Sequence, residues 1–170
     1  MGCDEHAYIE VKEDWGNGPH WACFAENINL GRNYHLYALL AGVRNHIGAT
    51  APYHGRGFPA DADWPIADAY SLWVVPDGTT AGEGECTATE AAKYLKYGSR
   101  WLDEEHTRIS HPDWHSCTWL TTAELQEVAD AYQKAYDPNE IRTLYAAIAA
   151  MRALDGDTPG RSRLVVWFDN

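Results

Sequence analysis

Cysteine is scarce in this sequence, with four among 170 residues. Cys3, Cys23, Cys86 and Cys117 are widely separated and form no C-x-x-C pair, which disfavours a zinc ribbon. Reduced and mostly buried thiols are the ordinary state of such residues in a cytosolic chain. We therefore expect the four thiols to be reduced.

Long apolar runs are absent as well. No run approaches the roughly 18 residues that a membrane-spanning helix needs, and we expect no signal peptide ahead of the first strand. The Met-Gly start is typical of N-myristoylation, but that motif needs Ser or Thr at position 6, where this chain has His6. These absences predict a soluble, cytoplasmic protein with no membrane partner.

Positive charge is sparse, since 13 Lys and Arg residues stand against 25 Asp and Glu and give a formal charge of -12 at pH 7. Such a field repels phosphates, so broad binding to long nucleic acid is disfavoured. A small anionic ligand held by a few arginines stays compatible, because nine of the 13 basic residues are Arg, which suits bidentate phosphate contact. Genome composition explains the same bias equally well.

Several catalytic signatures are missing. The sequence has no G-x-S-x-G elbow, Walker loop, G-x-G-x-x-G or H-E-x-x-H, which disfavours serine hydrolases, common NTPases, Rossmann enzymes and zincins. The stretch His115-Ser-Cys-Thr superficially resembles the H-x-S/T signature of two-histidine phosphoesterases. Cys117 occupies the position of the required hydroxyl, however, and no second copy exists.

The most informative segment that the sequence does contain is a strand expected over about residues 3–12. Side chains alternate between the two faces of a strand. Asp4, His6, Tyr8 and Glu10 therefore share one face, while Cys3, Ala7, Ile9 and Val11 face the other way. A face that combines carboxylates, an imidazole and a phenol predicts the floor of a site.

Turn residues and hydrophobic periodicity predict the remaining elements. Capping boxes, in which an N-cap hydroxyl and a Glu three residues later bond each other's backbone amides, open helices at Thr87 and Thr121, and Asp137 with the following Pro opens another. Residues 46–86 are rich in Pro and Gly and are expected to be irregular apart from one short strand. The expected strands are 3–12, 20–25, 70–75 and 163–170, and the expected helices are about 33–45, 87–98, 121–136 and 137–155.

Two terminal strands around a helical middle predict an α+β fold in a single domain, 1–170. Its small, mainly antiparallel sheet would include both terminal strands and pack against about four helices. Pairing of the ends would bring Asp4 and His6 close to one of three residues, Arg161, Arg163 or Asp169.

Five segments spread over the whole length carry a family resemblance, namely 1–6, 32–44, 56–59, 115–121 and 166–170. They resemble a family of small bacteriophage proteins that begin Met-Gly-Cys-Asp-Ile-His and end Trp-Phe-Asp-Asn. The resemblance implies a phage origin and one domain, and it carries over no established chemistry. Glu5 replaces the family's usual Ile, so we expect either a solvated strand face or an Arg partner for Glu5.

Asp4, His6 and His115 are the candidate catalytic residues. Asp4 and His6 stand two apart on one strand, where they can share a metal or act as an oriented acid–base pair. His115 and Ser116 precede a predicted helix start, where free amides and the helix dipole favour an anion. The alternative is structural, with Asp4 capping an amide, His6 bonding within the sheet and Ser116 serving a turn.

Two arginines and several aromatics extend this set. Arg44 and Arg56 can clamp a phosphate while an aromatic ring stacks on a base. Gly57 lets backbone approach a ligand closely or simply serves the turn. Tryptophans are mostly core residues, but two of them flank His115 and can form a pocket wall. The candidate ligand-binding residues are Tyr8, Arg44, Arg56, Trp114, Ser116 and Trp119.

A second histidine group, His106, His111 and His115, lies among acidic residues. A divalent metal is therefore left open as a cofactor, although the spacing matches no zinc signature. The same stretch is equally typical of a solvated loop whose charges face water.

These features together predict a phage counter-defence protein, acting in the cytoplasm of the infected host, that binds a small nucleotide-type signal such as a cyclic dinucleotide. It would neutralise the signal by phosphodiesterase-type hydrolysis or by sequestration as a non-catalytic sponge, often a homo-oligomer. The alternative is an acidic interaction protein that blocks a host enzyme or mimics DNA.

Overall fold

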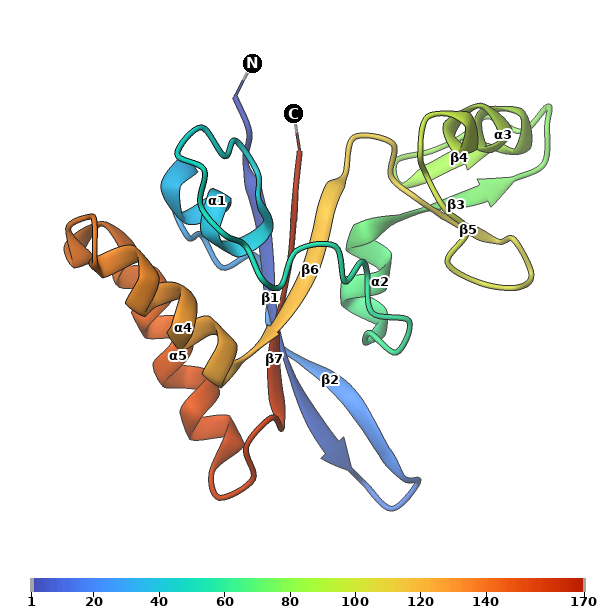
Figure 1. Ribbon diagram of the computed structural model, residues 1–170. Helices are drawn as coiled ribbons and strands as arrows, with labels where there is room; N and C mark the ends of the chain where they lie inside the picture. The colour runs from blue at the N-terminus through green and yellow to red at the C-terminus, as the bar shows by residue number, and fades with distance from the viewer. Residues whose placement is uncertain (1, 170) are drawn as a thin grey trace. The chain divides into compact units, whose positions relative to one another are not determined.

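The computed structural model describes residues 2–169 (Figure 1). Their contacts form two compact units, one made of the chain up to Asp63 together with the chain from His115, and the other of Trp64–Trp114. The expected single domain over 1–170 stays a prediction. Met1 and Asn170, the end positions of the family motifs and of the expected last strand, lie outside the described residues.

The first unit is built on a four-stranded antiparallel sheet whose central strands come from opposite ends of the chain. In sheet order these strands are β2 (Pro19–Ala25), β1 (Glu5–Asp14), β7 (Ser162–Phe168) and β6 (His115–Thr121). The register pairs Glu5 with Phe168 and Val11 with Ser162. The predicted α+β fold, with both terminal strands in a mainly antiparallel sheet, is confirmed.

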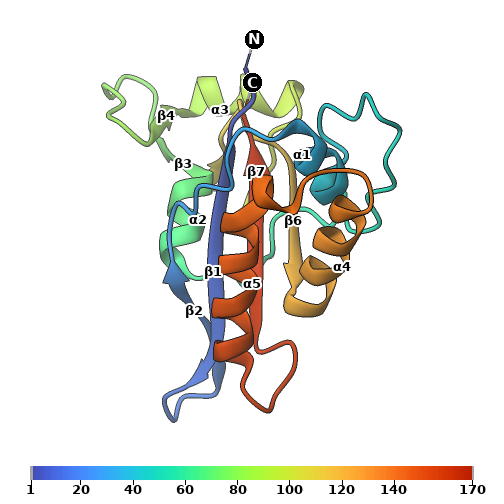
Figure 2. The same cartoon turned by 90° about the vertical axis from the view of Figure 1, so that its left-hand side faces the viewer.

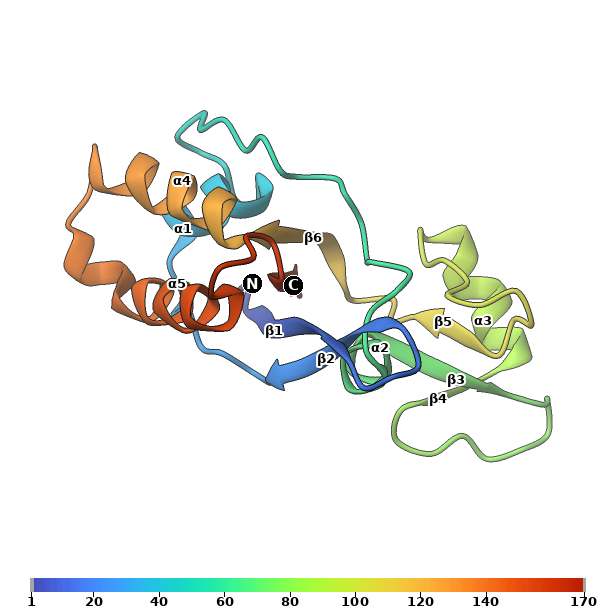
Figure 3. The same ribbon diagram turned by 90° about the horizontal axis from the view of Figure 1, so that it is seen from below.

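Three helices cover one face of this sheet, as Figures 2 and 3 show: α1 (Tyr34–Ala41), α4 (Thr122–Gln133) and α5 (Arg142–Asp155). A short 3-10 helix, η1 (Pro138–Ile141), leads into α5. Within residues 2–169, no helix combines the length and the apolar character that crossing a membrane requires.

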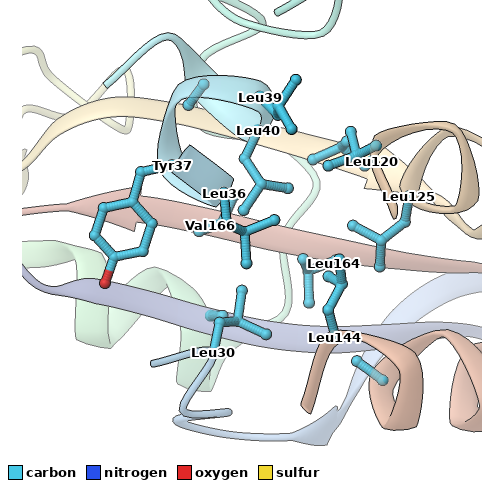
Figure 4. Packing of buried hydrophobic residues seen from close by; sticks show 14 of the residues in the cluster. Leu30, Leu36, Tyr37, Leu39, Leu40, Leu120, Leu125, Leu144, Leu164 and Val166 are labelled. Carbon is cyan, nitrogen blue, oxygen red and sulfur yellow. The ribbon is translucent and has the colours of Figure 1, made fainter. Parts of the chain in front are cut away.

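The core of the first unit lies between the sheet and these helices (Figure 4). Leu36 and Leu40 of α1 are fully buried and lie over Leu164 and Val166 of β7. Every residue of β7 is buried, which explains its nearly continuous apolar run. Burial of each leucine stabilises the fold by roughly 2 kcal/mol.

Local sequence signals set the helix starts. Thr87 and Thr121 form capping boxes with Glu90 and Glu124, as predicted. Asn33 caps α1 with its side chain, which accepts a hydrogen bond from a first-turn amide.

Two helices differ from prediction at one end. The helix expected to reach about residue 45 stops at Ala41, because Gly42 has a φ of 71°, the left-handed conformation that ends helices. Asp137 caps a 3-10 helix through the amide of Asn139, so α5 begins only at Arg142.

The second unit is smaller and has its own sheet. Its elements are α2 (Trp64–Tyr70), β3 (Ser71–Val75), β4 (Glu85–Thr87), α3 (Ala88–Lys96) and β5 (Arg108–Ser110). The central strand β3 is parallel to β4 and antiparallel to β5. Its core consists of Leu72, Cys86, Ala91 and Ile109.

The expectation that residues 46–86 are irregular is wrong in part. The short strand predicted at 70–75 is confirmed as β3, but the segment also contains α2 and β4. A seven-residue helix with Pro65 in its first turn and a three-residue strand are both too short to produce a recognisable period.

Glu5 lies neither on a solvated strand face nor beside an arginine, the two alternatives expected from the sequence. Its carboxylate accepts hydrogen bonds from the Tyr37 hydroxyl and, at 2.7 Å, from the Leu30 amide. Burial, together with this carboxylate, raises the pKa of Tyr37. Glu5 therefore fastens β1 to α1 and to the segment before it, without an arginine.

Leu164→Ala tests the position of this core. Leu164 is fully buried, so we expect the free energy of unfolding to fall by about 3 kcal/mol, through lost burial and a residual cavity. Ile47, which is 42% exposed, provides the control, since Ile47→Ala should change stability by less than about 0.5 kcal/mol. Equal losses in urea unfolding of the two variants would contradict the assignment.

Candidate functional site

The ends of β1 and β7 are joined just beyond the sheet by a pair of hydrogen bonds. The Asp4 amide donates to Asp169 Oδ1 at 2.9 Å, and the Asp169 amide donates to the Asp4 carbonyl oxygen at 3.1 Å. Of the three neighbours that sequence reasoning offered for this strand end, Asp169 is the one found there. Arg161 and Arg163 lie toward the other end of the strand pair, beside Glu13 and Glu10.

His6 lies directly beside Asp169. Its Nε2 atom is 3.3 Å from Asp169 Oδ2, and the two side chains are 26% and 29% exposed. An ionised carboxylate only accepts hydrogen bonds, so this contact assigns a proton to Nε2. The ring of Trp167 stacks on the imidazole with centroids 5.7 Å apart, which fixes the ring plane.

His115 reaches the same residue from the opposite side of β7. The register of β6 on β7 pairs His115 with Phe168, and His115 Nε2 lies 3.3 Å from the backbone carbonyl oxygen of Asp169. Its other ring nitrogen, Nδ1, lies 3.0 Å from the hydroxyl of Ser116. Two imidazoles from two strands therefore converge on Asp169 from opposite faces of the sheet, since His6 pairs with Trp167 and His115 with Phe168.

We call His6, His115, Ser116 and Asp169 the terminal histidine cluster. The pKa of the Asp169 carboxyl is lowered: burial acts to raise it but is outweighed by the Asp4 amide, the hydrogen bond to His6 and the charges of both imidazoles. The cluster thus combines an ionised carboxylate with two imidazoles, the side chains used most often in acid–base catalysis.

Asp4 is engaged by an arginine. Arg32 Nε and Nη2 donate to Asp4 Oδ1 at 2.7 and 2.5 Å, and Nη2 also donates to Oδ2 at 2.6 Å. The carboxylate partner of His6 is therefore Asp169. Asp4 bonds Asp169 through its backbone, and its own carboxylate is neutralised by Arg32. A catalytic role for Asp4 stays a prediction.

His115 does not precede a helix N-terminus, so the expectation that helix amides and a helix dipole favour an anion there is wrong. His115 begins the seven-residue strand β6, and α4 starts only at Thr122, roughly 20 Å further along the chain. A β-bulge between His115 and Thr118 breaks the two-residue alternation that would have revealed the strand.

Tyr8 forms the floor beside His6, on the shared face that sequence alternation predicts. Its ring stacks on Trp167 with centroids 4.9 Å apart, which places Trp167 in contact with both side chains. The Tyr8 hydroxyl donates to Asn27 Oδ1 at 3.0 Å, and burial raises its pKa. Since only 4% of Tyr8 is exposed, it supports the site from beneath.

The two tryptophans expected to flank His115 belong to different units. Trp119 lies in the first unit and packs against the guanidinium groups of Arg56 and Arg163. Trp114 lies in the second unit, where its ring is 4.6 Å from that of His111. Within each unit, therefore, each tryptophan has its own packing partner.

The guanidinium of Arg56 has several protein partners, although the residue is exposed. Its two terminal nitrogens bond Glu124 at 2.6 and 2.9 Å, and one of them also donates to the Trp119 carbonyl oxygen at 2.8 Å. The guanidinium lies between the rings of Tyr53, at 4.9 Å, and Trp119, at 4.5 Å. These contacts fasten a loop to α4, and the ligand role predicted for Arg56 stays a prediction.

Arg44 lies just after α1, and its backbone has a φ of 51°. Its guanidinium hydrogen-bonds the Cys3 thiol, whose pKa is nevertheless raised because burial outweighs the arginine. Both residues belong to the first unit, as do the members of the terminal histidine cluster. Ligand binding by Arg44 also stays a prediction.

Sequence reasoning missed an ion network on the face of β1 that carries His6 and Tyr8, in which Glu10 and Arg163 are buried and Asp61 is mostly exposed. Arg163 Nε lies 2.6 Å from Glu10, its Nη1 lies 2.8 Å from Asp61, and its guanidinium is 4.0 Å from the centre of the Trp21 ring. Burial raises the pKa of Glu10, against the opposing effects of the Asp63 amide and Arg163. Asp61 lies in a segment without periodicity, so nothing in the sequence pointed to it.

The second histidine group shows no metal geometry. Within residues 2–169, no group of three or more His, Cys, Asp or Glu side chains is arranged to hold a metal ion. His106 instead stacks on Trp101 with centroids 4.6 Å apart, and Asp103 accepts hydrogen bonds from Thr107. The described residues therefore contain no cluster of ligands that would support dependence on a divalent metal.

The second unit carries an open cavity of about 640 Å³. Charges of both signs line it, and the exposed ring of Tyr97 lies at its edge. None of the candidate catalytic or ligand-binding residues belongs to it, although His111 of the second histidine group does. Its lining residues are Leu72, Gly84, Glu85, Lys93, Tyr94, Tyr97, His111, Pro112 and Asp113.

No protein-family model, no curated protein and no solved structure matches this chain. The functional assignment therefore depends on the chemistry of the residues themselves.

Glu124→Gln tests the ion pair that holds Arg56. The hydrogen bond from Arg56 lowers the pKa of Glu124 to about 2, from an ordinary value of 4.5. The pair's stabilisation is therefore full above pH 4.5 and is lost as the pH falls toward about 2. We expect the variant to lose about 2 kcal/mol at pH 7 and to approach the original protein in stability near pH 2, as measured by urea unfolding across pH. A difference that did not depend on pH would rule out this account.

Proposed function

We propose that this protein is a phage counter-defence protein that binds a small nucleotide-type signal, such as a cyclic dinucleotide, at the terminal histidine cluster and neutralises it in the infected host. The observation that carries the proposal is the convergence of His6 and His115 on Asp169. The resemblance to phage proteins supports the setting, and the charge of -12 favours a small ligand over long nucleic acid.

Imidazoles suit the chemistry of phosphodiesters. An imidazole can take a proton from the attacking oxygen and give a proton to the leaving oxygen, and each such transfer typically contributes 10²–10⁴-fold to the rate. Trp167 stacks on His6, Phe168 stacks on His115, and Asp169 accepts a hydrogen bond from each ring, so little reorganisation is needed when a substrate binds. This arrangement favours hydrolysis.

Sequestration needs less from the same residues. Imidazole and hydroxyl groups can hold a phosphate without cleaving it, and a homo-oligomer would present several such sites. Recovery of the ligand after binding separates the two modes, because a sponge returns it intact and a hydrolase returns products.

One observation favours a second candidate, an acidic interaction protein that blocks a host enzyme. Trp15, at the turn between β1 and β2, is 72% exposed, and Phe24 of β2 is 54% exposed. Large exposed aromatics of this kind are enriched at the centres of protein interfaces. This candidate predicts binding that depends on Trp15 and is indifferent to His6.

A thermal-shift screen against cyclic dinucleotides, cyclic oligonucleotides and ADP-ribose derivatives tests the ligand proposal. A ligand at a hundredfold excess over its Kd stabilises the fold by about 2.7 kcal/mol, which corresponds to a rise in Tm of about 5–10 °C for a chain of this size. Chromatography of each hit then shows whether the ligand is intact.

The matched variants are His6→Gln and His46→Gln, since His46 is an exposed loop residue outside the cluster. We expect the first to abolish the ligand-dependent shift and the second to retain it, with both unliganded Tm values unchanged. The absence of a shift with every ligand class would overturn the nucleotide assignment and favour a protein partner.

A further inference from the structure

Ser116 has a backbone conformation that is unusual for a serine. It lies in the bulge of β6 and has a φ of 52°, in the left-handed region. Non-glycine residues in this region cost free energy, and such residues concentrate at functional sites. Its side chain is exposed. Glycine would adopt this conformation at lower cost, so the contact made by the serine hydroxyl deserves a separate account.

The hydrogen bonds of His115 define what that hydroxyl does. His115 Nε2 lies 3.3 Å from the carbonyl oxygen of Asp169, and a carbonyl only accepts, so Nε2 carries the proton of the neutral ring. Nδ1 is then an acceptor. Ser116 Oγ, 3.0 Å away, therefore donates its hydrogen to Nδ1.

A hydroxyl that donates to an imidazole whose other nitrogen is fixed by a third group is the arrangement of an activated nucleophile. We propose that Ser116 is the nucleophile of this site and His115 its general base, and that phosphodiesters are cleaved through a covalent phosphoserine ester. The choice of phosphodiesters rests on the proposed function, whereas the nucleophile rests on the geometry of His115 and Ser116.

The step balances with the groups present. Ser116 Oγ attacks phosphorus and its proton passes to His115 Nδ1, while the bond from phosphorus to the leaving oxygen breaks and that oxygen takes the proton from His115. Water then attacks the phosphoserine and gives a proton to Nδ1. The serine oxygen leaves phosphorus and recovers that proton, which restores the site.

Acidic residues of the same strand ends are paired. Arg32 neutralises Asp4 through bidentate contact, and the Asp169 carboxylate lies against His6. The general repulsion by an acidic protein is therefore reduced locally, where a single phosphodiester would sit.

A fluorophosphonate probe tests the nucleophile without a nucleotide. Attack by Ser116 forms an oxygen–phosphorus bond, breaks the phosphorus–fluorine bond and leaves the proton on His115. We expect one adduct per chain, located at Ser116 by mass spectrometry of peptides. Ser116→Gly should abolish it with an equal or higher Tm, because glycine adopts the left-handed conformation without strain.

His115→Gln separates catalysis from packing. Glutamine can still donate to the Asp169 carbonyl oxygen but has no basic nitrogen at the position of Nδ1, so we expect labelling to slow by about 100-fold or more. Ser99→Ala, in the second unit, is the control and should label normally.

Failure of the proposed nucleophile and failure of the proposed nucleotide ligand give different results. Labelling at Ser116 that depends on His115 supports the nucleophile, even where no nucleotide shifts the Tm, and in that case only the substrate class fails. No adduct at Ser116, or an equal rate in His115→Gln, overturns the nucleophile, even where nucleotides bind, and leaves a sponge.

Discussion

The antiparallel pairing of β1 with β7 is the constraint on which the first unit depends. Its register sets Glu10 opposite Arg163 and His6 opposite Trp167, so it creates both the buried ion pair and the stacked floor of the site. Because side chains alternate, a shift by one residue would move His6 into the apolar core and expose Ile9. One register therefore determines the packing of the core, the ion pair of Glu10 with Arg163 and the position of His6.

Asp169 connects the elements of the site with three different groups. Its amide bonds the Asp4 carbonyl oxygen, its carboxylate takes the Asp4 amide and His6, and its carbonyl oxygen takes His115. Main-chain groups thus supply much of the orientation. The rings of His6 and His115 are positioned by the sheet itself, which is more rigid than a loop and needs less reorganisation on binding.

The sequence was sufficient for those parts of the structure that depend on local signals or on strong alternation. The shared face of His6 and Tyr8 and the caps at Thr87 and Thr121 belong to this group, and the meeting of the two ends followed from their apolar character. What could not be predicted depends on non-local partners. The bulge concealed the strand that begins at His115. Asp61 joins the ion network by accepting a hydrogen bond from Arg163, which is 102 residues away in sequence.

The bond between His6 and Asp169 spans 163 residues of sequence. Closing so long a loop costs more chain entropy than forming helices or hairpins, so contacts of this kind form late in folding. The hairpin of β1 and β2 and the pair α4 and α5 can form from local contacts alone, whereas the two imidazoles reach Asp169 only after β7 has docked. A partly folded chain therefore has no assembled cluster, and any chemistry at this site begins only when the sheet is complete.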